Sequence, residues 1–292
     1  MAPSDSRLLR FARKVRHAPG LNRLGGLWRT LRPMYHQILE RVHGGRGIPL
    51  SLGAGGTMHV PASFVHNAID PLELAMLDVL TKHVKPDDCF YDVGASLGLH
   101  SLAVGEHLKR SGAIHAFEPE PASALEYWAN TRLLRSDGID VELHRCFVAD
   151  VSRNFVREKT RAAFTDLDLA RSKGALAHHL YLANPASAAE HPSVALDEYV
   201  TGGVRGPTLI KCDIEGAELL FLRGASRVIK QYQPTLFLSV HPTLLPQFGH
   251  TVEDVRQWLA DQGYGWELID ESGEMHIFAQ PVGRAPALAT TP

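Results

Sequence analysis

One lysine, several carboxylates and a histidine in the second half of the chain have the types and spacing that proton transfer requires. The segment Lys211 to Glu218 reads Lys-Cys-Asp-Ile-Glu-Gly-Ala-Glu and continues a run of apolar residues, and His241 directly follows a second apolar run. A histidine has an unperturbed pKa of about 6.5, which suits a base working near neutral pH. Side chains alternate along a strand, so Lys211 and Asp213 share a face. We expect Asp213 or His241 to accept a proton, and Lys211 to pair with Asp213 or Glu215.

These residues also admit structural interpretations. Glu215 and Glu218 are expected in the first turn of a helix, where the helix dipole favours carboxylates, and His241 can be a structural histidine. A further alternative is that Asp213, Glu215 and His241 bind a divalent metal ion that lowers the pKa of an alcohol. Their spacing matches no recognised metal motif, so our prediction assigns no metal site.

A second constellation predicts a ligand site built largely from backbone. The run Cys89 to Asp92 ends in a carboxylate, and Gly94 and Gly98 follow it. A tight strand-to-helix turn needs glycine where φ is positive or where a ligand lies close to the backbone, and the helix that follows offers amides to a ligand. The two glycines are four residues apart, unlike the G-x-G-x-x-G pattern of dinucleotide sites. An ordinary glycine turn in an α/β protein is the alternative.

An acidic residue after the next strand belongs to the same site. Glu118 lies twenty residues after Gly98, at the end of a predicted strand over 113–117. A carboxylate at this offset can accept hydrogen bonds from both hydroxyls of a ribose, although it can also cap the following helix. Pro119 then turns the chain.

Alternating strands and helices must position these residues. We predict strands at 89–92, 113–117, 141–148, 207–213 and 234–240, helices at 72–83, 97–109, 120–134, 214–229 and 252–261, and a closing hairpin of 265–269 with 275–279. This alternation predicts an α/β fold with a doubly wound, mostly parallel seven-stranded sheet and a C-terminal antiparallel hairpin. Asp213 and His241 then lie at the carboxyl ends of central strands, where such sheets bind ligands.

The 292 residues are predicted to form four segments, of which the sheet and its helices make up the largest. We predict a basic helical arm (1–47), a lead-in of hairpin and helix (48–85), the main domain (86–280) and a flexible tail (281–292). Residues 1–50 carry ten Lys or Arg against two carboxylates, which suits peripheral contact with an anionic membrane or a partner protein, or simply a solvated face. Residues 151–193 form an irregular insertion where an element covering the substrate would lie.

Charge and cysteine usage limit the function classes. The net charge is −2, and no aromatic stacking platform accompanies the basic arm, so we expect no nucleic-acid partner. Cys89, Cys146 and Cys212 fall in or beside predicted buried strands and suggest neither a disulfide framework nor a zinc cluster. The sequence contains no long apolar run and no secretory signal, so we expect a cytoplasmic protein.

Three separated motifs together resemble the FkbM family of methyltransferases that use S-adenosylmethionine (SAM). They are Asp92 to Gly98, Ala116 to Pro121, and Ile210 to Glu218 followed by Arg223-Gly224-Ala225. Ser96 departs from the family, which usually has asparagine there. The resemblance implies a class I methyltransferase fold and transfer of a methyl group to a hydroxyl of a small molecule, a sugar or glycan, or a natural product.

The resemblance also implies roles for individual residues. The residues expected to bind SAM are Asp92, Gly94, Ala95, Ser96, Gly98, Glu118, Pro119, Asp150 and Asp213, with Asp150 near the adenine unless it is a simple turn aspartate. The residues expected to be catalytic are Lys211, Asp213, Glu215 and His241. Two other functions remain as alternatives. One is an NAD(P)-dependent oxidoreductase, which the glycine spacing and the closing hairpin disfavour; the other is a non-catalytic scaffold or binding protein with a SAM-type fold.

Overall fold

The computed structural model describes residues 38–39, 41–45, 47–51, 57–62, 71–157, 191–271 and 274–283. Most of the predicted N-terminal arm, of the insertion and of the tail therefore lies outside the described residues. The chain divides into two compact units, Met1–Ile69 and Asp70–Pro292. In the first unit β1 (Ile48–Ser51) pairs antiparallel with β2 (Thr57–Val60), which confirms the predicted small hairpin.

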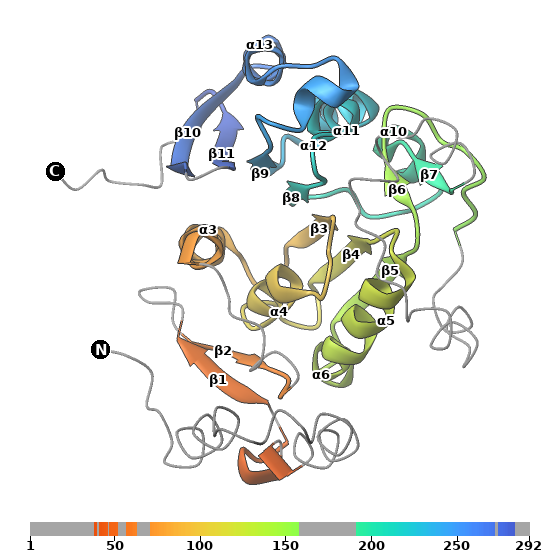
Figure 1. Ribbon diagram of the computed structural model, residues 1–292. Coiled ribbons are helices and arrows are strands. Elements are labelled where there is room, and N and C mark those ends of the chain that lie inside the picture. The colour runs from red at the N-terminus through yellow and green to blue at the C-terminus, as the bar shows by residue number, and fades with distance from the viewer. Residues whose placement is uncertain are drawn as a thin grey trace, which may run out of the picture. The chain divides into compact units, whose positions relative to one another are not determined.

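The second unit is built on one seven-stranded sheet with the order β10-β11-β9-β8-β3-β4-β5 (Figure 1). Its strands are β3 (Cys89–Val93), β4 (Ala113–Phe117), β5 (Asp140–His144), β8 (Leu209–Asp213), β9 (Thr235–Val240), β10 (Tyr264–Glu271) and β11 (Met275–Pro281). The five strands from β9 to β5 are parallel, whereas β11 is antiparallel to both β9 and β10. The predicted α/β fold with a C-terminal antiparallel hairpin is confirmed.

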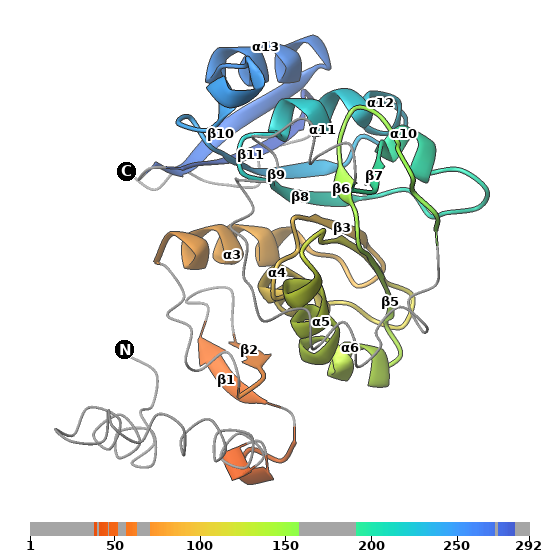
Figure 2. The ribbon, with the colours of Figure 1, turned by 45° about the vertical axis from the view of Figure 1, so that its right-hand side comes forward.

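Helices cover both faces of this sheet (Figure 2). One face carries α3 (Pro71–His83), α4 (Leu99–Gly105), α5 (Pro121–Asn130) and α6 (Arg132–Ser136). The other carries α10 (Leu196–Tyr199), α11 (Glu218–Gly224), α12 (Ser226–Tyr232), η5 (Leu245–Phe248) and α13 (Val252–Asp261). Every residue of β3, β4 and β9 is buried, as expected for strands whose two faces are both covered. Among the described residues, no helix is both long and apolar enough to span a bilayer.

Several predicted elements are shorter or divided. The helix predicted over 97–109 is α4 alone, because Gly98 has a left-handed backbone (φ 88°) and precedes the first helical residue. The helix predicted over 120–134 breaks at Thr131, whose hydroxyl donates to the carbonyl of Tyr127 at 2.8 Å, a bond that competes with helical geometry. The helix predicted over 214–229 starts only at Glu218 and is interrupted at Ala225 (φ −113°).

The strand predicted over 141–148 is also divided. Its first part is β5, and its second part, β6 (Phe147–Val148), pairs with β7 (Ser193–Val194) in a separate two-stranded sheet. This small sheet pairs a strand that follows β5 in the sequence with a strand directly after the predicted insertion.

Candidate active site

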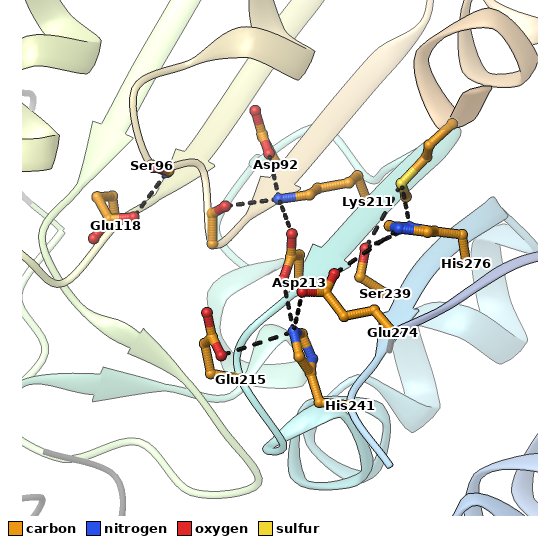
Figure 3. Close-up of polar contacts among 12 residues, drawn as sticks. Asp92, Ser96, Glu118, Lys211, Asp213, Glu215, Ser239, His241, Glu274 and His276 are labelled. Atoms are coloured by element: carbon orange, nitrogen blue, oxygen red, sulfur yellow. Dashed lines mark hydrogen bonds and ion pairs between the residues drawn. The ribbon is translucent and has the colours of Figure 1, made fainter. Parts of the chain in front are cut away.

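The carboxyl ends of four parallel strands bring the predicted site residues to one edge of the sheet (Figure 3). Asp213 is the last residue of β8, and His241 directly follows β9. Glu118 directly follows β4, and Gly94 directly follows β3. Because these strands are neighbours in the sheet, residues far apart in the sequence meet here.

The glycine turn after β3 lies against the neighbouring strand ends. Gly94 and Ala95 both donate their amides to the carbonyl of Phe117 at 3.0 Å. Gly94 has a φ of 73°, and a Cβ atom there would lie 1.8 Å from the carbonyl oxygen of Asp213. Only glycine fits between the ends of β3 and β8, so this residue sets how closely the turn approaches Asp213.

Glu118 fixes the same turn from the other side. One of its carboxylate oxygens accepts a hydrogen bond from the amide of Ser96, and the other accepts one from the amide of Glu120, both at 2.8 Å. The residue is 1 % exposed. Ser96 has a φ of 47°, a left-handed conformation that is uncommon for serine but accessible to asparagine, the residue usual in the family. Glu118 therefore holds a strained turn in place.

Lys211 links the turn to Asp213. Its Nζ donates to the carbonyl of Gly94 at 2.7 Å and lies 3.6 Å from Oδ2 of Asp213, one of its two predicted partners, and 3.8 Å from Oδ1 of Asp92. Burial lowers the pKa of Lys211, but Asp213 and Asp92 outweigh it and raise the pKa above its usual value. Lys211 is therefore a buried cation that holds two strand ends together.

Asp92 is fully buried beneath the turn. Its Oδ2 accepts a hydrogen bond from the hydroxyl of Ser101 at 2.6 Å, whereas its Oδ1 makes no hydrogen bond to any residue that the structure describes. Burial raises the pKa of Asp92 despite the opposing effect of Lys211. This carboxylate supports Lys211 and α4 from inside and does not face solvent.

The imidazole of His241 faces the carboxylates of Asp213, Glu215 and Glu274 (Figure 3). Because a carboxylate only accepts, Nδ1 of the imidazole donates to Oε1 of Glu218, at 2.8 Å. On the other side, Nε2 lies 3.5 Å from Oε1 of Glu274, 3.6 Å from Oδ1 of Asp213 and 3.8 Å from Oε2 of Glu215. Nε2 is buried and makes no hydrogen bond in the described part of the chain.

The protonation of His241 differs from our expectation of a base near neutral pH. Burial lowers the pKa of the imidazole, but the carboxylates of Glu218 and Glu274 outweigh burial and raise it to about 10. In this arrangement His241 already carries a proton at neutral pH and cannot accept another. Asp213, which is 30 % exposed, is left as the predicted base of the pair.

Glu215 is not in the first helical turn, where the sequence placed it. It has a left-handed backbone (φ 56°) and precedes Gly216, at which a Cβ would lie 2.8 Å from the backbone of Leu244. The turn formed by these residues delivers Glu215 toward His241. Glu218 is the first residue of α11, and its Oε1 also accepts from the amide of Gly216 at 2.9 Å.

Sequence reasoning gave Glu274 no role. It directly precedes β11, and Met275 pairs with Val240 at the end of β9. A strand that runs antiparallel to β9 begins where β9 ends, so the residue before β11 falls beside His241. The position of Glu274 could have been inferred from the predicted antiparallel hairpin, because that hairpin places the start of its second strand at the carboxyl edge of the sheet.

Two other residues predicted to bind SAM, Asp150 and Pro119, make fewer contacts with the rest of the site. Asp150 is exposed and follows the short strand β6, and the described contacts do not join it to the glycine turn. Pro119 is half-buried between Glu118 and the start of α5. Their predicted roles remain predictions.

A second group of histidines and a carboxylate lies on β4 and β5. The hydroxyl of Tyr199 lies 2.8 Å from Nδ1 of His115 and 2.7 Å from Nε2 of His144. Between the histidines, Glu142 accepts hydrogen bonds from Arg157 at 2.8 and 3.0 Å. Burial lowers the pKa of His115 to about 4. We call these five residues the Tyr199 cluster. We call His241 and the four carboxylates around it, Asp213, Glu215, Glu218 and Glu274, the His241 cluster.

Comparisons with solved structures give distant similarity. The chain is 15 % identical to an FkbM methyltransferase from Methylobacillus flagellatus KT, with a TM-score of 0.40 over 74 % of this chain and 57 % of that one. It is 14 % identical to a precorrin-6y C5,15-methyltransferase from Geobacter metallireducens GS-15, with a TM-score of 0.42 over 74 % and 90 % of the two chains. It is 11 % identical to an rRNA methylase from Streptococcus thermophilus, with a TM-score of 0.43 over 73 % and 98 %.

Family membership therefore depends on the sequence match and not on these superpositions. A search of curated proteins found no match. The sequence model of the FkbM methyltransferase domain matches residues 92–265, more than half of the chain, and spans all three motifs. This match supports methyltransferase activity, and we conclude that the chain belongs to the FkbM methyltransferase domain family.

Proposed function

We propose that this protein is a SAM-dependent O-methyltransferase that acts on a hydroxyl of a small molecule, a sugar or glycan, or a natural product. One observation carries the proposal. Lys211 bonds the carbonyl of Gly94 and pairs with Asp213, so a partly exposed carboxylate stands beside the glycine turn. A methyl donor on the turn and a hydroxyl beside Asp213 would then be neighbours.

The charge of the site suits a cationic donor. Five carboxylates of the described residues, Asp92, Asp213, Glu215, Glu218 and Glu274, lie around two cationic groups, Lys211 and His241. When bound, SAM supplies a methyl group activated by a positively charged sulfur. An excess of carboxylates favours such a cation. The residues proposed to hold SAM are the backbone of Gly94 to Gly98 and the carboxylate of Glu118, which also anchors that turn.

The chain's own groups would then orient the acceptor and remove its proton. Oδ2 of Asp213 faces Lys211 and Oδ1 faces His241, so two cations hold this carboxylate in one orientation. Asp213 is proposed to accept the proton of the acceptor hydroxyl, and general-base help of this kind typically adds roughly 10²–10⁴-fold to a rate. Correct positioning of two reactants contributes further, on the order of 7 kcal/mol when orientation is good.

Isothermal titration calorimetry tests the cofactor. We expect binding of SAM and of its demethylated product and none of NADH. The oxidoreductase alternative requires NADH binding, and the scaffold alternative requires that neither cofactor binds. Glu118→Ala is expected to weaken SAM binding, with the exposed Glu126→Ala on α5 as the matched control.

A methyl-transfer screen tests the acceptor. SAM with a labelled methyl group is incubated with the protein and with glycans, lipid-linked sugars, polyketides and RNA. Label on a hydroxyl of a glycan or natural product supports the proposal. Label on RNA alone would overturn both the acceptor class and our expectation that nucleic acid is not a partner.

A further inference from the structure

The imidazole of His241 directs one buried nitrogen toward carboxylates that lie too far away to form hydrogen bonds with it. The residue is 4 % exposed, and its Nε2 makes no hydrogen bond within the described residues. Carboxylate oxygens of Glu274, Asp213 and Glu215 lie 3.5, 3.6 and 3.8 Å from Nε2 (Figure 3). Buried polar atoms are normally partnered, so this nitrogen indicates that a further group belongs beside it.

The protonation of the ring limits what that group can be. Nδ1 donates to Oε1 of Glu218 at 2.8 Å, which fixes the orientation of the ring from the buried side. Although burial lowers the pKa of this imidazole, Glu218 and Glu274 raise it to about 10, so both nitrogens carry a proton near neutral pH. Nε2 therefore offers a proton and no lone pair. Its missing partner is a hydrogen-bond acceptor and not a metal ion.

A ligand hydroxyl fits between His241 and Asp213. A hydroxyl oxygen can accept one hydrogen bond and donate another. Nε2 and Oδ1 of Asp213 are 3.6 Å apart, so an oxygen at an ordinary hydrogen-bond distance of about 2.8 Å from each can bridge them. Lys211 pairs with the other oxygen, Oδ2, which leaves Oδ1 available. This position matches the one that the proposed function gives to the acceptor hydroxyl.

Charge indicates what should accompany that hydroxyl. The four carboxylates of the His241 cluster are balanced by two positive charges, on the imidazole of His241 and on Lys211. SAM brings one net positive charge, because its sulfonium and amino groups outweigh its carboxylate. One negative charge then remains without a counter-charge, and Asp92 adds to this excess whenever it is ionised.

Glu215 and Glu274 are the carboxylates of this cluster that a ligand can reach most easily. Their side chains are 44 % and 46 % exposed. Among the described residues, their ion-pair partners are histidines and not lysines or arginines: His241 for both, and His276, at 3.9 Å, for Glu274. Two accessible carboxylates without a lysine or arginine partner favour a ligand that carries a positive charge.

We propose that the acceptor is an amino alcohol, in which an ammonium group neighbours the hydroxyl that is methylated. Nε2 of His241 and Oδ1 of Asp213 would bind the hydroxyl. Glu215 and Glu274 would bind the ammonium on their solvent side, away from the imidazole. Charge-assisted hydrogen bonds are stronger than neutral ones, so they favour this class over neutral alcohols. A phosphate or carboxylate beside the hydroxyl would instead add negative charge. The inference rests on the proposed function, because it names the acceptor class of the same site.

The same groups account for the proton in the methyl transfer. The acceptor oxygen bonds the methyl carbon as the S–C bond of SAM breaks, and the electron pair of that bond stays on sulfur. The hydroxyl proton passes to Oδ1 of Asp213. The hydrogen bond from Nε2 of His241 stabilises the negative charge that develops on the oxygen as this proton leaves.

Ligand-observed NMR with the full chain tests the acceptor class. Glucosamine is compared with N-acetylglucosamine, in which the ammonium becomes a neutral amide, and with glucose; serinol is compared with glycerol. Titrations are made below the pKa of the amines, with and without the demethylated product of SAM. We expect at least one amino alcohol to bind about tenfold more tightly than its neutral counterparts. Glu215→Gln and Glu274→Gln should each reduce this preference several-fold and change the binding of the neutral probes little.

Glu267→Gln is the matched control. It changes an exposed carboxylate on β10, in the same hairpin as Glu274, and is expected to bind every probe like the unchanged protein. No binding of either amino alcohol, equal binding of charged and neutral probes, or a preference that survives both Glu215→Gln and Glu274→Gln would each overturn the proposal. An equal loss in Glu267→Gln would overturn it as well.

Calorimetry with SAM on the same samples separates this proposal from the proposed function. Protein that binds SAM but shows no preference for the amino alcohols disproves the acceptor class and leaves the methyltransferase proposal intact. Protein that prefers an amino alcohol through Glu215 and Glu274 but binds neither SAM nor its demethylated product supports the ammonium site and contradicts the proposed function.

Discussion

The Tyr199 cluster and the His241 cluster both combine histidine with carboxylate, yet they differ in how their polar atoms are partnered. In the Tyr199 cluster, one hydroxyl joins two imidazoles and an arginine pairs with the carboxylate. In the His241 cluster, Nδ1 of the imidazole bonds Glu218, whereas Nε2 faces three carboxylates and makes no hydrogen bond within the described residues. Buried polar groups are normally paired, so the second arrangement calls for an explanation.

The comparison shows that a close group of histidines and carboxylates is not by itself evidence of a functional site. The Tyr199 cluster joins β4, β5 and α10, and its histidines and tyrosine are buried, so its pairing stabilises the fold. The His241 cluster lies at the strand ends, and three of its carboxylates reach solvent. Changes in the first cluster should therefore affect stability, and changes in the second should affect chemistry.

The largest expected effect is on turnover. Asp213→Asn keeps the shape of the side chain but removes the proposed base, so we expect kcat to fall roughly 10²–10⁴-fold. SAM binding should fall much less than kcat, because Asp92 remains as a partner of Lys211 and Glu118 still anchors the glycine turn. Steady-state kinetics with an identified acceptor measures the first effect and calorimetry the second. Unchanged turnover would remove Asp213 from the mechanism.

The next effect is a dependence of stability on pH that comes from the Tyr199 cluster. The pKa of His115 is about 4 when folded, against an ordinary value of 6.5, because the ring is buried. The unfolded chain therefore binds more protons between these values, and the free energy of unfolding should rise with pH across that window by about 3 kcal/mol at most.

Glu142 extends the same trend to lower pH. Its pKa is held at about 2, first by His144 and then by Arg157, while burial opposes them. Its folded pKa is depressed, so its contribution to stability is present above its ordinary value of 4.5 and is lost as pH falls toward 2. Urea denaturation between pH 3 and 7 measures both effects, and His115→Gln should show a shallower slope between pH 4 and 6.5. A flat profile between pH 4 and 6.5 in the unchanged protein would contradict the assignment of His115, and a flat profile below pH 4.5 that of Glu142.

A smaller effect is expected from Tyr199→Phe. The change leaves two buried imidazole nitrogens without their shared partner, so the free energy of unfolding should fall by about 1–3 kcal/mol. Turnover per folded molecule should be unchanged. Glu274→Gln is the mirror control, since changing a partly exposed carboxylate should alter stability by only about 0.5 kcal/mol. If Tyr199→Phe lost turnover but kept its stability, the Tyr199 cluster would serve the reaction and not the fold, contrary to our comparison.

The smallest effect is expected from Ser96→Asn. Asparagine tolerates the left-handed conformation that Ser96 adopts, and such strain typically costs on the order of 1 kcal/mol. We expect a rise in Tm that corresponds to a fraction of this energy, measured by calorimetry. A fall in Tm would show that the serine side chain makes a contact that outweighs the strain.

The sequence predicted the parts of the fold that follow from local patterns. The bounds of β4 and α13 match the predictions, since Ala113–Phe117 is continuously apolar apart from one histidine and Val252–Asp261 has a capping box at Thr251. It also predicted that Lys211 pairs with Asp213 or Glu215, and the structure has the pair with Asp213, with which Lys211 shares a face of the strand. Helix ends were less predictable, because the pattern of apolar residues does not mark the hydrogen bond of Thr131 to Tyr127 or the backbone change at Ala225.

The chemistry of the site was harder to predict than its location. Topology alone placed His241 next to Asp213, but the pKa of an imidazole depends on every charge packed around it. Glu218 and Glu274 raise that pKa, and they lie 23 residues before and 33 residues after His241 in the sequence. The Tyr199 cluster was missed because it joins β4, β5 and α10 through a hydroxyl that no motif marks.

The antiparallel strand β11 has a consequence for which positions of the chain can be varied. It starts at the carboxyl edge of the sheet, so Glu274, directly before Met275, lies beside His241 and is partly exposed. A substitution at this position can change the charge next to His241 while the packed layers of the sheet stay intact. The start of the last strand is thus a place where the proposed site can be altered without repacking the core.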